Sequence, residues 1–161
     1  MDNKEIIVKL NDVLMYEYGH LGIYATQTKT IGDRQIAHVF DRFRHLEEEH
    51  AEKIRTLIID LGGKPGLRSK LGDEGGKVLG FVLQVTGTIN VLKADLKMEG
   101  IAVNNYHELC NKIEDESIRD RMLENMIDAR LMYLWLADKI AEYEEERTRE
   151  CHLKGYPSEW R

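Results

Sequence analysis

The sequence has little proline, little cysteine and no long run of hydrophobic residues. Proline stands only at positions 65 and 157 of the 161 residues, so long stretches are free of the strongest helix breaker. The two cysteines, Cys110 and Cys151, are too few for a disulfide framework and lack the spacing of a metal site, which favours a reducing, cytoplasmic location. No basic stretch followed by an apolar one opens the chain, so we expect no secretory signal.

The longest stretch without a charged residue is Val78–Leu92. It falls short of the ~20 apolar residues that a membrane-spanning helix needs. We expect a buried helical segment there, or one that meets an apolar ligand, a membrane surface or a second subunit in a homodimer. The net charge of −6, without a concentrated basic stripe, argues against a nucleic-acid partner.

Apolar residues recur at helical spacing along most of the chain, which predicts an all-α fold. The length of 161 residues suits one domain, which we place at 1–148, followed by a C-terminal tail at 149–161. The predicted helices are 3–30, 34–61, 76–112 and 116–148.

The lengths of the predicted connections indicate how these helices are arranged. Short links near Gly32-Asp33 and Glu114-Asp115 predict two antiparallel hairpins, with Asp33 as a helix N-cap. The glycine-rich link between the second and third helices has roughly fourteen residues and reaches up to ~45–50 Å. A link of that reach can run the length of a bundle, which favours a four-helix bundle with one long crossover.

Two glutamates stand seven residues ahead of a tyrosine, at matching points in the two halves of the chain. They are Glu17 with Tyr24 and Glu99 with Tyr106. Buried carboxylates at the centre of a bundle are costly unless a cation compensates them. We therefore expect the glutamates to bind metal and the tyrosines to hydrogen-bond the carboxylates.

A Glu-x-x-His motif, Glu47 with His50, follows Glu17 after thirty residues. With Glu17 it forms the carboxylate and imidazole pattern by which four-helix bundles hold two iron or manganese ions. The matching positions of the second half are Ala129 and Met132, which offer neither carboxylate nor imidazole. The sequence therefore predicts half of a dinuclear site and one tightly bound metal per chain, with iron favoured and manganese or zinc as alternatives.

Several of these residues also have simpler interpretations. Glu47 and His50 lie in a strongly charged segment and alone would suit a solvated helix face. His20, three residues after Glu17, could supply the imidazole that the last helix lacks or could simply hydrogen-bond in the core. Arg130, beside the empty position, could pair with Glu99 but fits surface exposure better. We expect no haem, because the second predicted helix shows no methionine at a position that would bind haem between two subunits.

The motifs resemble two branches of the ferritin-like superfamily. The segment 91–106 and the Trp135-Leu136 pair look like bacterioferritin, whose last-helix glutamate and histidine would fall at Ala129 and Met132. The segment E17-Y-G-H-L-G-I-Y-A-T-Q27 is similar to the demethoxyubiquinone hydroxylases. The second resemblance implies a di-iron centre that activates oxygen beside a lipid quinone, with Glu17, Glu47, His50 and Glu99 on the metal.

Three functions are compatible with the sequence. The first is an iron-dependent oxidoreductase that uses oxygen or peroxide. The second is a non-catalytic bundle that binds an apolar ligand or acts through dimerisation, since small residues such as Gly80 and Gly87 allow close helix packing. The third is a subunit of an iron-storage cage.

Overall fold

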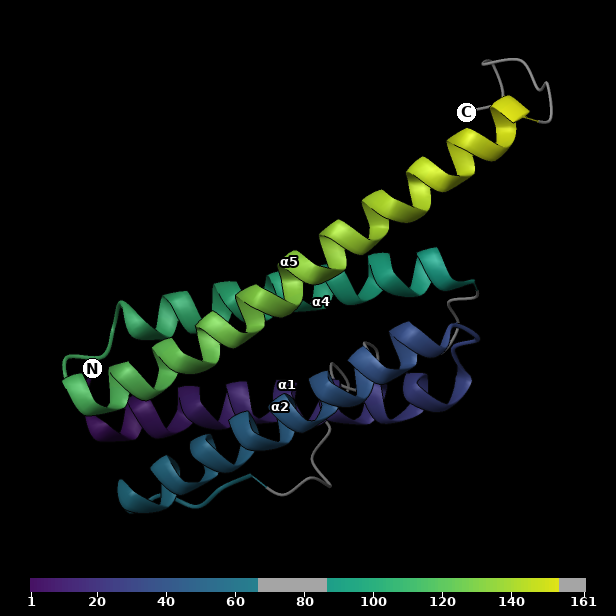
Figure 1. Cartoon of the computed structure of the whole chain (residues 1–161). Coiled ribbons are helices and arrows are strands. Elements are labelled where there is room, and N and C mark those ends of the chain that lie inside the picture. The colour runs from purple at the N-terminus through teal and green to yellow at the C-terminus, as the bar shows by residue number, and fades with distance from the viewer. Residues whose placement is uncertain (67–86, 154–161) are drawn as a thin grey trace.

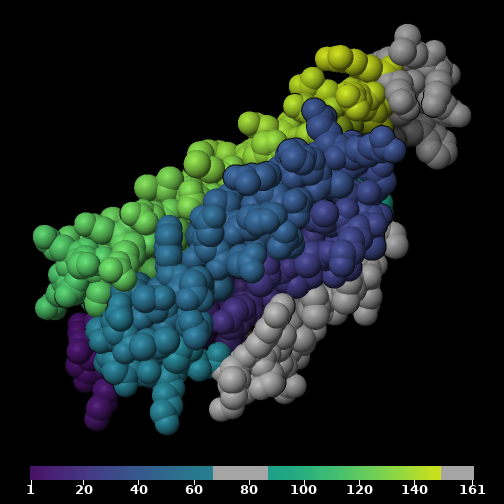
Figure 2. Space-filling model, turned by 60° about the horizontal axis from the view of Figure 1, so that its bottom comes forward, coloured from purple at the N-terminus to yellow at the C-terminus, as the bar shows by residue number. Residues whose placement is uncertain are grey.

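The computed structural model describes residues 1–66 and 87–153. The described residues form four helices: α1 (Asn3–Thr30), α2 (Arg34–Asp60), α4 (Thr88–Cys110) and α5 (Glu116–Leu153). Helix α1 packs along α2, and α4 packs along α5, so the molecule is built from two antiparallel hairpins (Figure 1). The space-filling view shows α2 lying between α1 and α5 on one face (Figure 2).

The ends of the helices confirm the predicted topology. Helix α2 ends and α4 begins at opposite ends of the bundle (Figure 1). The chain between them must therefore cross the length of the bundle, as the long connection predicted. The architecture is a four-helix bundle with one crossover.

Local sequence explains where the helices start. The Asp33 side chain accepts hydrogen bonds from the backbone N–H groups of Gln35 and Ile36, at 2.8 and 3.1 Å, and so caps α2 as predicted. Asp115 accepts from the N–H of Ile118 at 3.0 Å and does the same for α5. These caps fix the two short turns and hence the antiparallel hairpins.

Three of the helices have other boundaries than predicted. Helix α2 ends at Asp60 rather than at residue 61. Gly62, two residues later, has a φ of 78°, a conformation that favours glycine and ends helices. Helix α4 covers Thr88–Cys110 of the predicted 76–112, because Gly87 has a φ of 87° and cannot continue a helix; residues 76–86 lie outside the described residues. Helix α5 continues to Leu153 instead of stopping at 148, since no glycine or proline interrupts it before Gly155.

The core consists of two hydrophobic clusters, one toward each end of the bundle. One cluster contains Leu10, Ile54 and Tyr106, and the other contains Tyr24 and Phe40. Buried glutamates and histidines come from the same helices and belong to neither cluster. They form a polar layer within the interior, and this layer is the candidate site.

In the part of the chain that the structure describes, no helix combines the length and the apolar character required to cross a membrane. The predicted contact surface along Val78–Leu92 lies largely outside the described residues, and its described part, from Gly87, opens α4.

Candidate metal centre

Five acidic and histidine side chains from three helices converge at the middle of the bundle. Helix α1 contributes Glu17 and His20, α2 contributes Glu47 and His50, and α4 contributes Glu99. Each is at most 3% exposed. The three-residue spacing within α1 and within α2 puts each glutamate and its histidine on one helix face.

These five residues divide into two groups that share one carboxylate. Glu17, Glu47 and His50 have potential ligand atoms within 4.8 Å of one another, and so do His20, Glu47 and Glu99. His50 Nδ1 lies 3.5 Å from an oxygen of Glu17 and 3.5 Å from one of Glu47. On the other side, His20 Nδ1 lies 3.2 Å from Glu47 and 3.6 Å from Glu99. Glu47 therefore stands between two sets of three residues, each able to hold a metal ion.

The unsatisfied atoms of this cluster fit a metal ion. The buried Oε2 atoms of Glu17, Glu47 and Glu99, and Nδ1 of His50, have no hydrogen-bond partner. Buried polar atoms in folded proteins nearly always have one, so each such atom calls for an explanation. Carboxylate oxygen combined with imidazole nitrogen suits iron, manganese and zinc.

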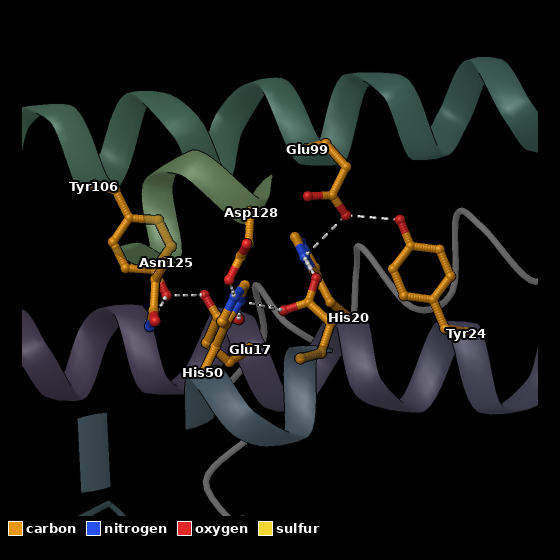
Figure 3. Close-up of polar contacts among 9 residues, drawn as sticks. Glu17, His20, Tyr24, His50, Glu99, Tyr106, Asn125 and Asp128 are labelled. Carbon is orange, nitrogen blue, oxygen red and sulfur yellow. Dashed lines mark hydrogen bonds and ion pairs between the residues drawn. The ribbon is translucent and has the colours of Figure 1, made fainter. Parts of the chain in front are cut away.

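Two tyrosines hold the outer glutamates in place. The Tyr106 hydroxyl donates to Glu17 Oε1 and the Tyr24 hydroxyl donates to Glu99 Oε1, both at 2.6 Å (Figure 3). In each glutamate the bonded oxygen is Oε1 and the free oxygen is Oε2. Each tyrosine therefore fixes a carboxylate of the other hairpin while leaving one oxygen available to an ion. The pairing is crossed: each glutamate bonds the tyrosine of the other helix, not the one seven residues after it in its own helix.

Helix α5 supports the site from outside the two groups. The Asn125 side-chain amide donates to the Tyr106 hydroxyl at 3.2 Å, and Asp128 Oδ2 lies 3.3 Å from His50 Nε2 (Figure 3). A carboxylate on one ring nitrogen of a histidine fixes which tautomer is present and presents the other nitrogen to a metal. Nδ1 of His50, which faces Glu17 and Glu47, is then the available nitrogen.

The site holds its protons strongly in the absence of metal. Burial lowers the pKa of both histidines, but the surrounding carboxylates outweigh it and raise the pKa of His20 to about 10 and of His50 to about 11. Burial, followed by the charge of Glu47, raises the pKa of Glu17 to about 7 and of Glu99 to about 8. Burial also raises the pKa of Glu47, but the neighbouring carboxyl group of Glu17 and the charges of the histidines outweigh it and lower the pKa. Two imidazolium groups thus compensate the carboxylates when no cation is present.

Apolar side chains occupy the two positions of α5 at which the bundle pattern would place a glutamate and a histidine. Ala129 and Met132 are each 1% exposed and pack in the cluster with Tyr24. Arg130 is exposed and lies over the ring of Tyr133, with 5.3 Å from its guanidinium carbon to the ring centre, so it replaces no cation at Glu99. The absence of carboxylate and imidazole at these positions is as the sequence indicated.

Sequence reasoning brought together Glu17, Glu47, His50 and Glu99, and the structure places all four in one cluster. It left the role of His20 open, and the geometry puts this residue in the second group of three. It did not find Asn125 or Asp128. No sequence spacing points to these two, because they act across the interface between hairpins.

A cleft of about 360 Å³ leads toward the second group of residues. It lies between α1 and α4, and its lining includes Val13, Tyr16 and His20 from α1 and Leu109 from α4. Lysines 9 and 112 also line it. The cleft is large enough for a small molecule and mixes apolar and charged surface.

Comparisons with known proteins agree with this architecture. A family model described as a ferritin-like domain matches residues 14–142. The chain is 22% identical over 111 residues to the mitochondrial NADPH-dependent 3-demethoxyubiquinone 3-hydroxylase of Dictyostelium discoideum, an alignment that covers 69% of this chain and 51% of the hydroxylase. The chain therefore spans about half the length of that relative.

Solved structures show the same fold. The dodecameric thioferritin of Bacteroides fragilis, a bacterioferritin-related protein, superposes with a TM-score of 0.79 at 20% identity, covering 92% of each chain. A two-domain protein from Anabaena variabilis, with DJ-1/ThiJ/PfpI-like and ferritin-like domains, superposes with a TM-score of 0.72 at 17% identity, over 90% of this chain and 38% of that one. The match of the family model over 14–142, on a four-helix bundle with a central carboxylate and histidine cluster, shows that this chain belongs to the ferritin-like family.

Proposed function

We propose that this protein binds a pair of iron ions and acts as an oxygen- or peroxide-dependent oxidoreductase. The observation that carries the proposal is Glu47, a buried carboxylate shared by two groups of three residues. One ion would be held by Glu17, Glu47 and His50, and the other by His20, Glu47 and Glu99. In this arrangement His20 of α1 supplies the second imidazole. The bundle pattern would place that imidazole on the last helix.

The residues around the two groups have distinct tasks. The three glutamates provide the negative charge that attracts cations, and burial strengthens that attraction. Tyr24 and Tyr106 restrain two of the carboxylates through the 2.6 Å hydrogen bonds, so little ordering remains when an ion binds. Bound iron would supply one-electron redox chemistry toward oxygen or peroxide.

The cleft between α1 and α4 provides a route for a small molecule. It reaches His20, a member of the second group. A substrate or reductant in this cleft would approach that group from the side of Tyr16 and Leu109. This route supports a reaction with a small organic molecule as well as with an inorganic one.

The relatives support the proposal at the level of the family. The Dictyostelium relative is a hydroxylase, and the Bacteroides structure is a bacterioferritin-related protein that assembles as a dodecamer. We therefore propose that this chain forms a homo-oligomer, with a dimer as the smallest form. Storage of iron by such an assembly is the competing function within the family.

The first test is metal stoichiometry and oxygen consumption on the same sample. Protein stripped with a chelator is titrated with ferrous iron without oxygen, and bound iron is counted by elemental analysis. We expect two irons per chain, followed by oxygen uptake on exposure to air. One iron per chain would support the single site predicted from the sequence and contradict the paired site.

Two other outcomes would replace the proposed function. If the protein binds no iron, manganese or zinc, the histidines neutralise the carboxylates by themselves and the chain is a non-catalytic bundle. If it binds iron and deposits hundreds of ions per assembly without turnover of an added substrate, storage replaces the oxidoreductase proposal.

A further inference from the structure

A second buried polar pair joins α1 to α4 outside the two metal-ligand groups. Gln27 is 6% exposed and Asp95 is fully buried, and neither belongs to either group. The Gln27 side-chain amide donates from Nε2 to Asp95 Oδ1 at 2.8 Å. Gln27 lies three residues after Tyr24 and Asp95 lies one turn before Glu99, so the pair occupies the same side of the bundle as the Tyr24–Glu99 hydrogen bond.

Each member of this pair has one atom without a partner. Asp95 Oδ2 and Gln27 Oε1 are buried and form no hydrogen bond. Both atoms are acceptors when Asp95 is ionised, so the pair would then contain a buried negative charge with a single hydrogen bond and an unsatisfied amide oxygen. A buried ionised carboxylate is very unfavourable unless it is fully compensated.

A proton on Asp95 Oδ2 removes both deficiencies together. The carboxylic acid then donates from Oδ2 to Gln27 Oε1, while Gln27 Nε2 donates to Oδ1. A protonated carboxyl group and a primary amide each have one donor and one acceptor in the same plane, so they can close a ring of two hydrogen bonds. All four polar atoms of the pair are then satisfied.

We propose that Asp95 is a neutral carboxylic acid in the folded protein, closed into a two-bond ring with the Gln27 amide, and that this ring is a proton-holding link between α1 and α4 beside the metal-ligand groups.

The electrostatic surroundings are consistent with a neutral Asp95. Burial raises the pKa of Asp95 to about 7, against smaller lowering contributions from the Gln27 hydrogen bond and from the charge of His20. Glu99 follows on the same helix, and Tyr24 faces the pair from α1. Among the described residues, no group of α2 or α5 contributes to the shift.

This link makes the contact between α1 and α4 sensitive to pH. Since the folded-state pKa lies above the ordinary 3.8, the folded protein keeps the proton where the unfolded chain has lost it. The stabilisation by this proton is complete below about 4 and is lost as the pH rises toward 7. Above that range the Oδ2–H to Oε1 bond is lost.

Infrared spectroscopy of the purified protein tests the proton directly. Protein with ¹³C in the aspartate side-chain carboxyl groups is compared with unlabelled protein at pH 5.5 and pH 9. A protonated aspartic acid gives a carbonyl band that moves with the label, whereas the protonated glutamates of the metal-ligand groups do not move. We expect one such band at pH 5.5 that disappears at pH 9 and is missing from Asp95→Asn at both values. Absence of a label-sensitive band at pH 5.5 would overturn the proposal and indicate an ionised Asp95 bridged to Gln27 by water.

A thermal unfolding series provides a second measurement. Asparagine can close the same two hydrogen bonds with Gln27 and has no proton to lose. We expect Asp95→Asn to melt at a higher temperature than the natural protein at pH 8.5 and at nearly the same temperature at pH 5. The exposed Asp12→Asn is the matched control and should show no such gap at pH 8.5. A variant that is less stable than the natural protein at pH 8.5 would contradict the proposal. Neither measurement requires iron to bind, so failure of the proposed oxidoreductase function would be seen separately.

Discussion

The two hairpins contribute very differently to the candidate metal centre. The α1–α2 hairpin supplies four of the five residues in the two groups, Glu17, His20, Glu47 and His50, whereas the α4–α5 hairpin supplies only Glu99. Helix α5 contributes Asn125 and Asp128, which contact Tyr106 and His50. Neither belongs to the two groups of potential metal ligands. In the proposed dinuclear centre, one hairpin would hold most of the ligands and the other would orient them.

The largest expected effect comes from the residue that both groups share. Glu47→Ala removes a carboxylate from each group, so we expect bound iron to fall from two ions per chain to none. Elemental analysis after chelation and reloading measures this. Glu49→Gln, an exposed change two residues away on the same helix, is the control and should leave the iron content unchanged. Retention of one iron in Glu47→Ala would show that the groups are independent.

Removing one histidine at a time tests the two ligand groups separately. His20→Ala disrupts the Glu47–Glu99 side and His50→Ala disrupts the Glu17 side, so each variant should keep about one of the two irons. The single-site alternative gives a different pattern, in which His20→Ala keeps all the iron and His50→Ala loses it. His45→Ala, at an exposed histidine of α2, is the control for loss of a histidine as such.

The protons held by the site predict how stability depends on pH. In the metal-free protein the pKa values of His20 and His50 are raised from 6.5 to about 10 and about 11, so the stabilisation by their positive charge is present at pH 6.5 and is lost as the pH rises through those values. The raised pKa values of Glu17 and Glu99 act in the same direction, because ionising these buried acids costs free energy as the pH rises from 4.5 to about 8.

We therefore expect the free energy of unfolding of metal-free protein to fall between about pH 5 and pH 10. Chemical denaturation at several pH values measures it. Added iron should reduce this loss, because a metal ion binds more strongly as the ligands release protons. A metal-free protein that becomes more stable across this range would contradict the assigned protonation.

We expect the smallest effects from substituting the two tyrosines. One tyrosine lies on the Glu99 side of the site and the other on the Glu17 side. Tyr24→Phe removes one hydrogen bond to Glu99, whereas Tyr106→Phe removes one to Glu17 and also leaves the Asn125 amide without its acceptor. We expect iron affinity to fall by about 10-fold for Tyr24→Phe and somewhat more for Tyr106→Phe. Competition with a coloured iron chelator measures both. Equal affinities for the two variants would show that Asn125 adds nothing to the Glu17 side.

The sequence predicted the helices, the crossover and four residues of the site, because each of these depends on position along the chain. Helical spacing gives the length of each helix, and counting from a short turn gives the level of a residue in the bundle. Glu17 and Glu47 lie about equally far from the turn at residue 32, so their meeting could be predicted without coordinates.

Only the tertiary structure decided which residues meet across the bundle. The rotation of α1 about its axis turns His20 toward Glu47 and Glu99, and the packing of α5 brings Asp128 to His50. Spacing along one helix fixes the level and the relative direction of its own side chains, but the direction in which a face points depends on all the helices packed against it. For this reason the sequence determined the fold and the Glu17, Glu47, His50 and Glu99 set, whereas the place of His20 in the second group and the Gln27–Asp95 pair became visible only in the folded chain.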